Sequence, residues 1–93
     1  MDVELNLFGP YRDAVGSKSL EVTVDDGATV RELFRTLGED HPDLSAKILD
    51  DGGDLVGSVT VTKNGRDVKL IDGADTIIED GDVLRAAPPV HGG

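Results

Sequence analysis

The feature that most constrains the fold is a change in hydrophobic periodicity at Thr29. Before this residue, apolar and polar residues alternate in segments 3–7 and 20–24, which is the pattern of strands with one buried face. After it, apolar residues recur at helical spacing, at Val30, Leu33, Phe34 and Leu37. The sequence therefore predicts a pair of strands joined through segment 11–18, followed by an amphipathic helix that packs across them.

The start and end of this helix also have sequence signals. Thr29 and Glu32 have the spacing of a capping box, in which the threonine hydroxyl accepts from the Glu32 amide and Glu32 reaches back to the Thr29 amide. Gly38 is placed to cap the helix C-terminus. Pro42 then predicts a second short helical turn, with Leu44, Ile48 and Leu49 facing inward.

The remaining chain predicts strands separated by turns. Segment 59–62 alternates as a third strand, and Asn64-Gly65 favours a type I′ turn into a return strand over 66–70. Asp80-Gly81 predicts another turn before a last strand over 82–87. The expected fold is α+β with the β-grasp order, a mixed sheet of about five strands covered by one main helix.

Composition excludes several classes of function. Cysteine is absent, which excludes disulfides, zinc ribbons and a thiol carrier, and the net charge of −10 disfavours nucleic acid. No apolar run is as long as a membrane span and no signal peptide is expected, so we predict no membrane association and a cytoplasmic location. Fourteen Asp against four Lys is typical of a salt-adapted, halophilic archaeal protein, the alternative being an acidic protein from a low-salt host.

Catalytic and metal-binding patterns are weak. The acidic loop 50–54 has Leu55 where a calcium loop needs glycine and Val61 where it needs glutamate. With only two histidines, His41 and His91, a transition-metal site is poorly supplied, and the serines lack the pattern of a nucleophile with its base. We therefore predict neither a metal site, nor a bound cofactor, nor an enzyme.

The C-terminal segment has the strongest functional pattern. Pro88-Pro89 favours extended backbone, and Gly92-Gly93 can enter a channel too narrow for side chains. We predict a domain over residues 1–87 and a flexible tail over residues 88–93, whose terminal carboxylate is the reactive group. The alternatives are a glycine-rich chain end without function and a β-grasp binding module with an accidental tail.

Several motifs of this chain resemble those of the ubiquitin-like sulfur carriers and protein modifiers. The likeness extends over essentially the whole chain, through Leu7-Phe8, segments 11–16, 29–33 and 61–66, and His41-Pro42. Its most specific part is Asp80-Gly81-Asp82-Val83 leading to Pro88-Pro89-Val90-His91-Gly92-Gly93. This family includes the small subunit of molybdopterin synthase, the thiamine-pathway sulfur carrier and the small archaeal modifiers.

The resemblance implies a mechanism in which another protein does the catalysis. An E1-like enzyme would use ATP and Mg²⁺ to adenylate the Gly93 carboxylate, after Pro88, Pro89, Val90, His91 and Gly92 have threaded into it. Attack by a lysine amine would form an isopeptide bond with a target protein, and a desampylase-type isopeptidase would remove the tag. Attack by sulfur would instead give a thiocarboxylate for tRNA thiolation or for the large subunit of molybdopterin synthase. One chain could serve both roles, and we favour the modifier.

Other expectations concern lysines, assembly and partner choice. Lys18, Lys47, Lys63 and Lys69 are the possible acceptors of a further copy, and we expect a monomer. The position before Pro-Pro is often bulky in the sulfur carriers but is Ala87 here, which bears on how the chain docks. His91 stands where a small residue is usual; it is interpreted as a solvated tail histidine, the alternative being that it narrows the choice of activating enzyme.

Overall fold

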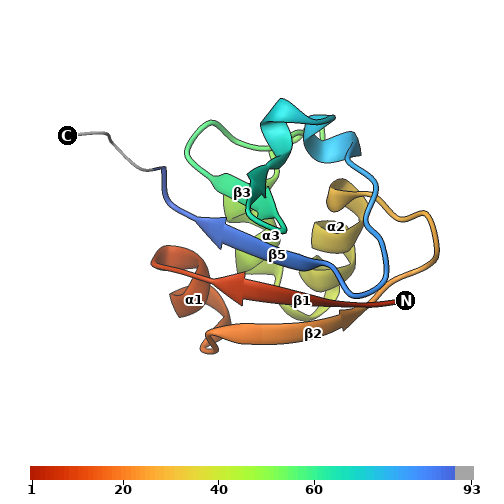
Figure 1. Ribbon diagram of the computed structural model, residues 1–93. Helices are drawn as coiled ribbons and strands as arrows, with labels where there is room; N and C mark the ends of the chain where they lie inside the picture. Colours follow the sequence, from red (N-terminus) through yellow and green to blue (C-terminus); the bar gives the residue numbers. More distant parts are fainter. Residues whose placement is uncertain (90–93) are drawn as a thin grey trace.

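In the computed structural model of the protein, residues 1–89 are described, and these form one sheet with helices on one face (Figure 1). The elements follow in the order β1 (Asp2–Leu7), α1 (Pro10–Val15), β2 (Ser19–Thr23), α2 (Val30–Asp40), α3 (Pro42–Ile48), β3 (Thr60–Lys63), β4 (Arg66–Asp67), the 3-10 turns η1 (Val68–Leu70) and η2 (Gly73–Asp75), and β5 (Val83–Ala87). The predicted α+β class and five-stranded mixed sheet are confirmed.

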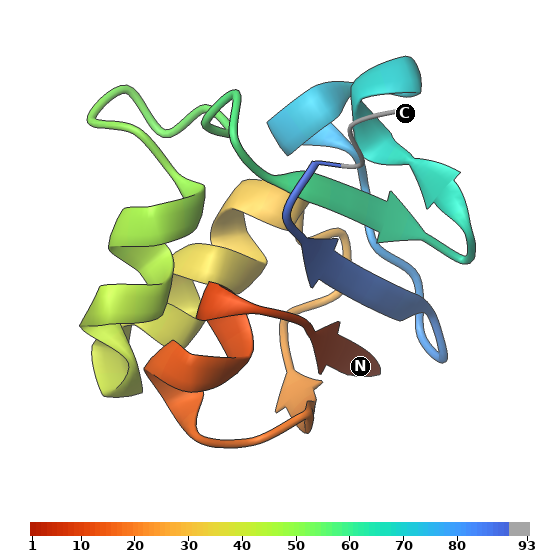
Figure 2. The ribbon, with the colours of Figure 1, turned by 90° about the vertical axis from the view of Figure 1, so that its left-hand side faces the viewer.

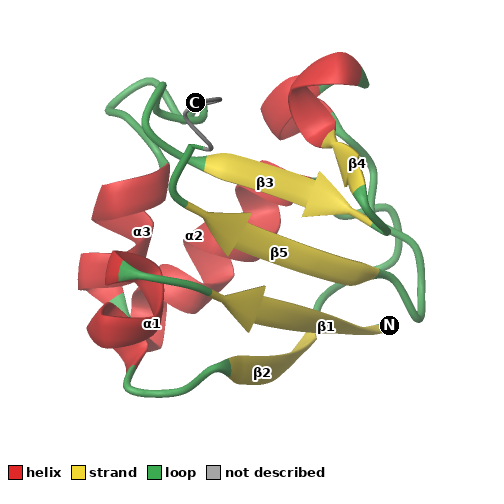
Figure 3. Ribbon diagram, turned by 60° about the vertical axis from the view of Figure 1, so that its left-hand side comes forward, coloured by secondary structure: helices red, strands yellow, loops and turns green. Residues whose placement is uncertain are grey.

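The sheet has the strand order β2-β1-β5-β3-β4, so the last strand lies in its middle. β5 runs parallel to β1 and antiparallel to β3, and the remaining pairs are antiparallel. Figure 3 looks onto the face of the sheet opposite α2 and shows β5 between β1 and β3. Because β1 and β5 are parallel, their C-terminal ends lie at the same end of the sheet.

The core lies between the sheet and α2. The apolar stripe of α2 is buried as predicted, and Phe34 is fully covered. It packs in a cluster with the inward residues of the strands, among them Val3, Leu5, Leu7, Val61 and Leu84. α3 contributes Leu44 and Ile48 to the same cluster, which confirms the predicted second helical segment after Pro42.

The turn predictions are confirmed where glycine or asparagine needs a left-handed backbone. Asn64 has φ 51° and Gly65 has φ 88°, as a type I′ turn requires.

The predicted capping box of α2 is formed in part. The Thr29 hydroxyl accepts from the Glu32 amide at 3.3 Å. The other half of the capping box differs, because the Glu32 carboxylate lies 3.4 Å from that hydroxyl rather than bonding the Thr29 amide. The Val30 amide donates to the Thr76 carbonyl and the Ile78 amide donates to the Ala28 carbonyl, which makes an isolated bridge between Thr29 and Ile77.

Three local predictions were wrong or incomplete. Gly38 does not end α2, because the helix continues to Asp40 and has His41 as its cap. A Cβ at Gly38 would lie 2.9 Å from the Ser45 Cβ, so the glycine lets α3 pack closely against α2. The predicted return strand over 66–70 stops at Asp67, because the Asp67 carboxylate accepts from the Lys69 amide and turns the chain into η1. Segment 11–18 contains the short helix α1, started by Pro10.

Candidate functional site

β5 carries the chain to the predicted reactive end. Its residues pair with β1 on one side, where Leu7 lies opposite Ala86, and with β3 on the other, where Thr60 lies opposite Ala87. Held on both sides, the strand ends at Ala87 and Pro88-Pro89 follow without regular structure. Figure 2 shows that the described chain after β5 leaves the sheet at the end where β1 stops. The predicted residues Val90, His91, Gly92 and Gly93 lie outside the described residues.

Phe8 and Gly9 form the base of this exit, and neither was predicted as a site residue. The Phe8 amide donates to the Ala86 carbonyl at 3.1 Å, which extends the pairing of β1 and β5 by one residue. Gly9 has φ 57°, and a Cβ there would lie 3.1 Å from the Pro88 Cγ. Gly9 therefore leaves the space that Pro88 occupies. The signal was present in the sequence as Gly-Pro directly after a strand.

The start of β5 is fixed by a polar cluster around Asp82. The Asp82 carboxylate accepts from the Glu79 amide at 2.8 Å and from the Asn64 side chain at 2.9 Å, and the Lys63 ammonium lies 3.4 Å away. Burial alone would raise the pKa of Asp82, but these three partners together lower it below its ordinary value. The cluster ties the 79–82 turn to β3 and so sets where β5 begins.

The four predicted acceptor lysines fall into two pairs. Lys63 Nζ donates to the Ile77 carbonyl at 3.0 Å and to Glu79 Oε1 at 3.1 Å, and Lys69 Nζ donates to the Val59 carbonyl at 3.0 Å. Burial alone would lower the pKa of Lys63, but its carboxylate partners raise it overall, which reduces the fraction of nucleophilic amine. Lys18, in the β1–β2 connection, and Lys47, on α3, are both exposed.

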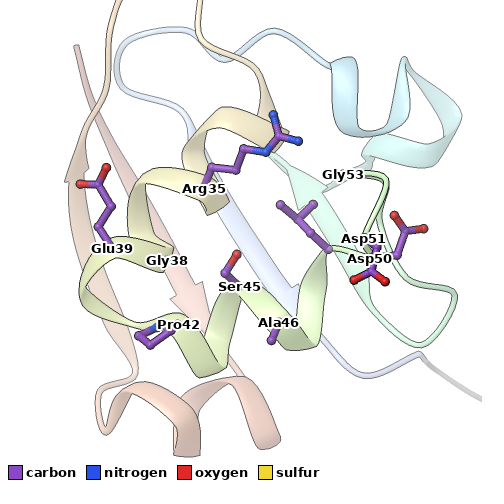
Figure 4. Close-up of a pocket in the computed structure, with 10 residues that line it drawn as sticks. Arg35, Gly38, Glu39, Pro42, Ser45, Ala46, Asp50, Asp51 and Gly53 are labelled. Atoms are coloured by element: carbon purple, nitrogen blue, oxygen red, sulfur yellow. The ribbon is translucent and has the colours of Figure 1, made fainter.

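A large hollow is on the helical side of the molecule. It measures about 460 Å³ and lies between α2, α3 and loop 50–54, with Arg35, Glu39, Ser45, Asp50 and Asp51 around it (Figure 4). None of its described lining residues is a histidine or lysine that could act as a base for Ser45. Asp50 Oδ1 accepts from the amides of Gly52 and Asp54, so it shapes its own loop.

Two further observations concern metal ligands and long apolar helices in the described part of the chain. Within residues 1–89, no group of three or more His, Asp or Glu side chains is arranged to hold a metal ion. Across the same range, no helix has the length and apolar character needed to cross a bilayer. The feature that stands out is the exit of the chain beside Phe8 and Gly9.

Comparisons with known proteins find relatives that match this chain along its whole length. The chain is 41% identical to small archaeal modifier protein 3 of Haloferax volcanii, over all 93 residues of this chain and the full length of that protein. The crystal structure of a second modifier from the same organism, small archaeal modifier protein 1, superposes with a TM-score of 0.82 at 31% identity, and both chains are covered completely.

A further solved structure comes from a second archaeon. A molybdopterin converting factor subunit 1 from Pyrococcus furiosus has a TM-score of 0.78 and 26% identity, with 97% of this chain and 99% of that chain covered. The profile of the ThiS family matches residues 5–93, which is nearly the whole sequence. The chain is therefore a β-grasp protein that belongs to the ThiS family.

Proposed function

We propose that this protein is a ubiquitin-like modifier that is attached to target proteins through the carboxylate of Gly93. The observation that supports this most directly is that β5, the middle strand of the sheet, runs straight into Pro88-Pro89, so the segment that leads to Gly93 starts where the strand pairing stops. The two modifier relatives from Haloferax volcanii favour the same function.

The proposed chemistry needs an activating partner. A carboxylate is a poor acyl donor because its leaving group would be oxide. An E1-like enzyme would let the Gly93 carboxylate attack the α-phosphate of Mg²⁺-bound ATP, so that pyrophosphate leaves and an acyl adenylate forms. A lysine amine of the target would then attack the acyl carbon, lose a proton and displace AMP. This chain would supply the acyl group and the docking surface, and the partner would supply the catalytic groups.

The experiment that tests the proposal is mass spectrometry of the protein and its conjugates from the native host. Trypsin cuts after Arg85, so a target lysine would carry the eight residues Ala86 to Gly93 as a branch. Finding this branch on lysines of other proteins supports the modifier. Finding the protein only as unmodified free chain in all growth conditions would contradict it.

A sulfur carrier is the second candidate, and the relative from Pyrococcus furiosus favours it. Because the chain has no cysteine, any sulfur would have to be carried on the terminal carboxylate as a thiocarboxylate. The same mass spectra would show it as an intact chain in which one oxygen is replaced by sulfur. The expected partners would then include the large subunit of molybdopterin synthase.

Deletion of Gly92-Gly93 provides a matched control for both functions. The described core ends before these residues, so the truncated chain should keep its circular dichroism spectrum and its thermal midpoint. Conjugates and thiocarboxylate should both disappear. If the truncated protein still formed either product, Gly93 would not be the reactive residue.

A further inference from the structure

The two edges of the sheet, β2 and β4, differ in how much backbone they expose. β4 is two residues long, and the Asp67 carboxylate accepts from the Lys69 amide and turns the chain into η1. β2 is five residues long, and its register with β1 is unbroken. It contains neither proline nor lysine, two of the residues that keep natural edge strands from pairing with another chain. In Figure 3, β2 forms the rim of the sheet on the side away from β4, where a further strand can add to it.

The hydrogen bonds to β1 determine which backbone groups of β2 point outward. The Met1 amine donates to the Val24 carbonyl at 2.8 Å, and the Val24 amide donates back to the Met1 carbonyl at 2.9 Å. Bonded and non-bonded positions alternate along an antiparallel pair, so the even-numbered residues of β2 direct their amides and carbonyls toward β1. The odd-numbered residues Ser19, Glu21 and Thr23 therefore direct theirs away from the sheet. We call these three residues the β2 edge.

Within residues 1–89, most backbone groups of the β2 edge have no partner. The Ser19 carbonyl accepts from the Ser17 hydroxyl at 3.0 Å. The amides and carbonyls of Glu21 and Thr23 have no partner among the described residues. A strand that pairs antiparallel with β2 would bond all four of these groups. The backbone thus provides a site for an extended segment, and the side chains decide which segment fits.

Carboxylates surround the position beside Glu21. The Glu21 side chain lies on the free face of the sheet, directly opposite Glu4 on β1. A residue that pairs with Glu21 would place its own side chain on the same face. There it would meet a hollow of about 340 Å³ over β2, β1 and the start of β5. The lining of this hollow includes Asp2, Glu4 and Glu21 and contains neither lysine nor arginine.

These three carboxylates have no cationic partner among the described residues. Asp2 accepts from the Thr23 hydroxyl at 2.7 Å, and Glu4 accepts from the Asn6 side chain at 3.0 Å. No ion pair within residues 1–89 includes Asp2, Glu4 or Glu21. Glu4 and Glu21 repel each other across the strand pair. A lysine or arginine beside Glu21 would relieve this repulsion, and its long side chain extends toward Glu4 because neighbouring strands are only about 4.8 Å apart.

The other face of an added strand would meet Leu20. Leu20 lies on the core side of β2 but is only half-buried, whereas Val22 is buried. The residues on either side of the basic one would point to this core side. β-branched residues such as valine would cover the exposed part of Leu20 and suit the extended backbone. The matching segment therefore has the pattern apolar, basic, apolar.

We infer that the β2 edge binds an extended basic segment of a partner protein, paired antiparallel with β2, whose lysine or arginine lies between Glu21 and Glu4. A second copy of this chain does not fit, because its own β2 has no lysine or arginine and would add further carboxylates. β1 separates the edge from β5, so the partner can bind without covering Pro88. This recognition goes beyond the proposed function, because it needs neither the activation nor the attachment of Gly93.

Blocked five-residue peptides test the β2 edge in an NMR titration of the full chain in about 0.1 M KCl. The peptide TVRVT should shift the amides of Ser19, Glu21 and Thr23. The peptide TVEVT should bind about tenfold more weakly, because its glutamate faces Glu21 and Glu4. TVRVT methylated on the arginine amide nitrogen keeps its charge but cannot donate to the Glu21 carbonyl, and it should also bind about tenfold more weakly. Raising KCl to about 2 M should reduce the difference between TVRVT and TVEVT.

Two variants separate the local effect of Glu21 from the effect of net charge. Glu21→Gln should bring the affinities for TVRVT and TVEVT to within about threefold of each other. Asp51→Asn removes the same charge from the exposed loop 50–54 and should keep the tenfold difference. Circular dichroism checks that both variants are folded.

Four outcomes would overturn the inference. The first two are equal binding of TVRVT and TVEVT by the unmodified chain, and shifts that are strongest outside β2. Undiminished binding of the methylated peptide would show charge attraction without strand pairing. Concentration-dependent shifts of Ser19 and Glu21 without peptide would assign the edge to a second copy. None of these results depends on Gly93, so a failure here is distinguishable from a failure of the proposed function.

Discussion

Gly9 shows how a single residue determines the direction in which the C-terminal segment leaves the body. Its backbone has φ 57°, and Pro88 occupies the space where a Cβ would lie. Gly9→Ala should therefore lower the free energy of unfolding by about 1–2 kcal/mol for the backbone, plus the cost of displacing Pro88. Urea denaturation measures the sum, and the NMR shifts of Pro88 report the displacement.

Gly16→Ala is the matched control for this prediction. Gly16 has φ 81°, but no atom lies within 4 Å of the position where its Cβ would be. Gly16→Ala should therefore lower the free energy of unfolding by the backbone contribution alone, without a contribution from packing. The NMR shifts of Pro88 should stay unchanged. Equal losses for the two variants, with no movement of Pro88, would contradict the role given to Gly9.

Asp82 predicts a dependence of stability on pH. Its pKa in the folded protein is below the ordinary value of 3.8, so its contribution to stability is full above that value and is lost as the pH falls through the folded pKa. Asp82→Asn should lower the free energy of unfolding by about 1–3 kcal/mol at neutral pH. This deficit should shrink as the pH falls below about 3.8, because the unfolded chain takes up its proton there first, and it should disappear once the pH is below the lowered pKa of the folded carboxylate.

The same titration with Asp51→Asn tests whether the effect belongs to the cluster around Asp82. Asp51 is exposed in the 50–54 loop, and its side chain has no hydrogen bond with the described residues. Its variant should follow the wild-type pH profile. A deficit of Asp82→Asn that stayed constant down to pH 2 would show that the carboxylate charge does not matter.

At the scale of elements, Arg31 joins three segments that are far apart in the sequence. From α2, its Nε donates to the Gly53 carbonyl at 2.6 Å and its guanidinium pairs with Asp54 and, in η2, with Asp75. Arg31→Gln should therefore lower the hydrogen-exchange protection factors of the amides in segments 50–54 and 73–76 several-fold. The protection factors of β1 and β5 should be unchanged. Arg66→Gln, an exposed change on β4, should leave both loops as they are.

The same scale shows what could be read from the sequence. The periodicity of 3–7, 20–24 and 30–37 predicted β1, β2 and α2 because one face of each is buried and long enough to leave a pattern. Asn64-Gly65 predicted its turn because the type I′ geometry needs those residues. The β-grasp order followed from these elements together.

Other features depended on contacts between segments and left no clear local pattern. Gly38 resembles a helix stop but is set by the approach of Ser45 from α3, and the end of β4 is set by the side chain of Asp67. The prediction of a reactive end rests on residues 88–93 alone and stays a prediction. The surroundings of this end could not be predicted, since Phe8 and Gly9 meet Ala86 and Pro88 only through the parallel pairing of β1 and β5.

For the whole molecule, charge is the property with the widest consequences. The chain has a net charge of −10, and Glu4 and Glu21 lie directly opposite each other on exposed positions of β1 and β2. Like charges opposite each other in a sheet are destabilising, and salt screens them. The exposed carboxylates of this sheet face thus lie on β1 and β2, whereas its positions on β3 and β5 around Arg85 and Ala87 carry no carboxylate.

This distribution predicts that stability rises with salt. Between about 0.1 M and about 2 M KCl, the screening length falls from about 10 Å to below 3 Å, so the free energy of unfolding from chemical or thermal denaturation should increase. Glu21→Gln should stabilise the protein by about 0.2–1 kcal/mol at the lower concentration and have almost no effect at the higher one. Asp51→Asn removes the same net charge, but no carboxylate lies opposite Asp51 as Glu4 lies opposite Glu21. This variant should therefore raise the free energy of unfolding by less at low salt. Equal stabilisation by the two variants would mean that the net charge alone, and not the Glu4–Glu21 pair, sets the effect. A wild-type free energy of unfolding that did not change with salt would contradict destabilisation by charge repulsion.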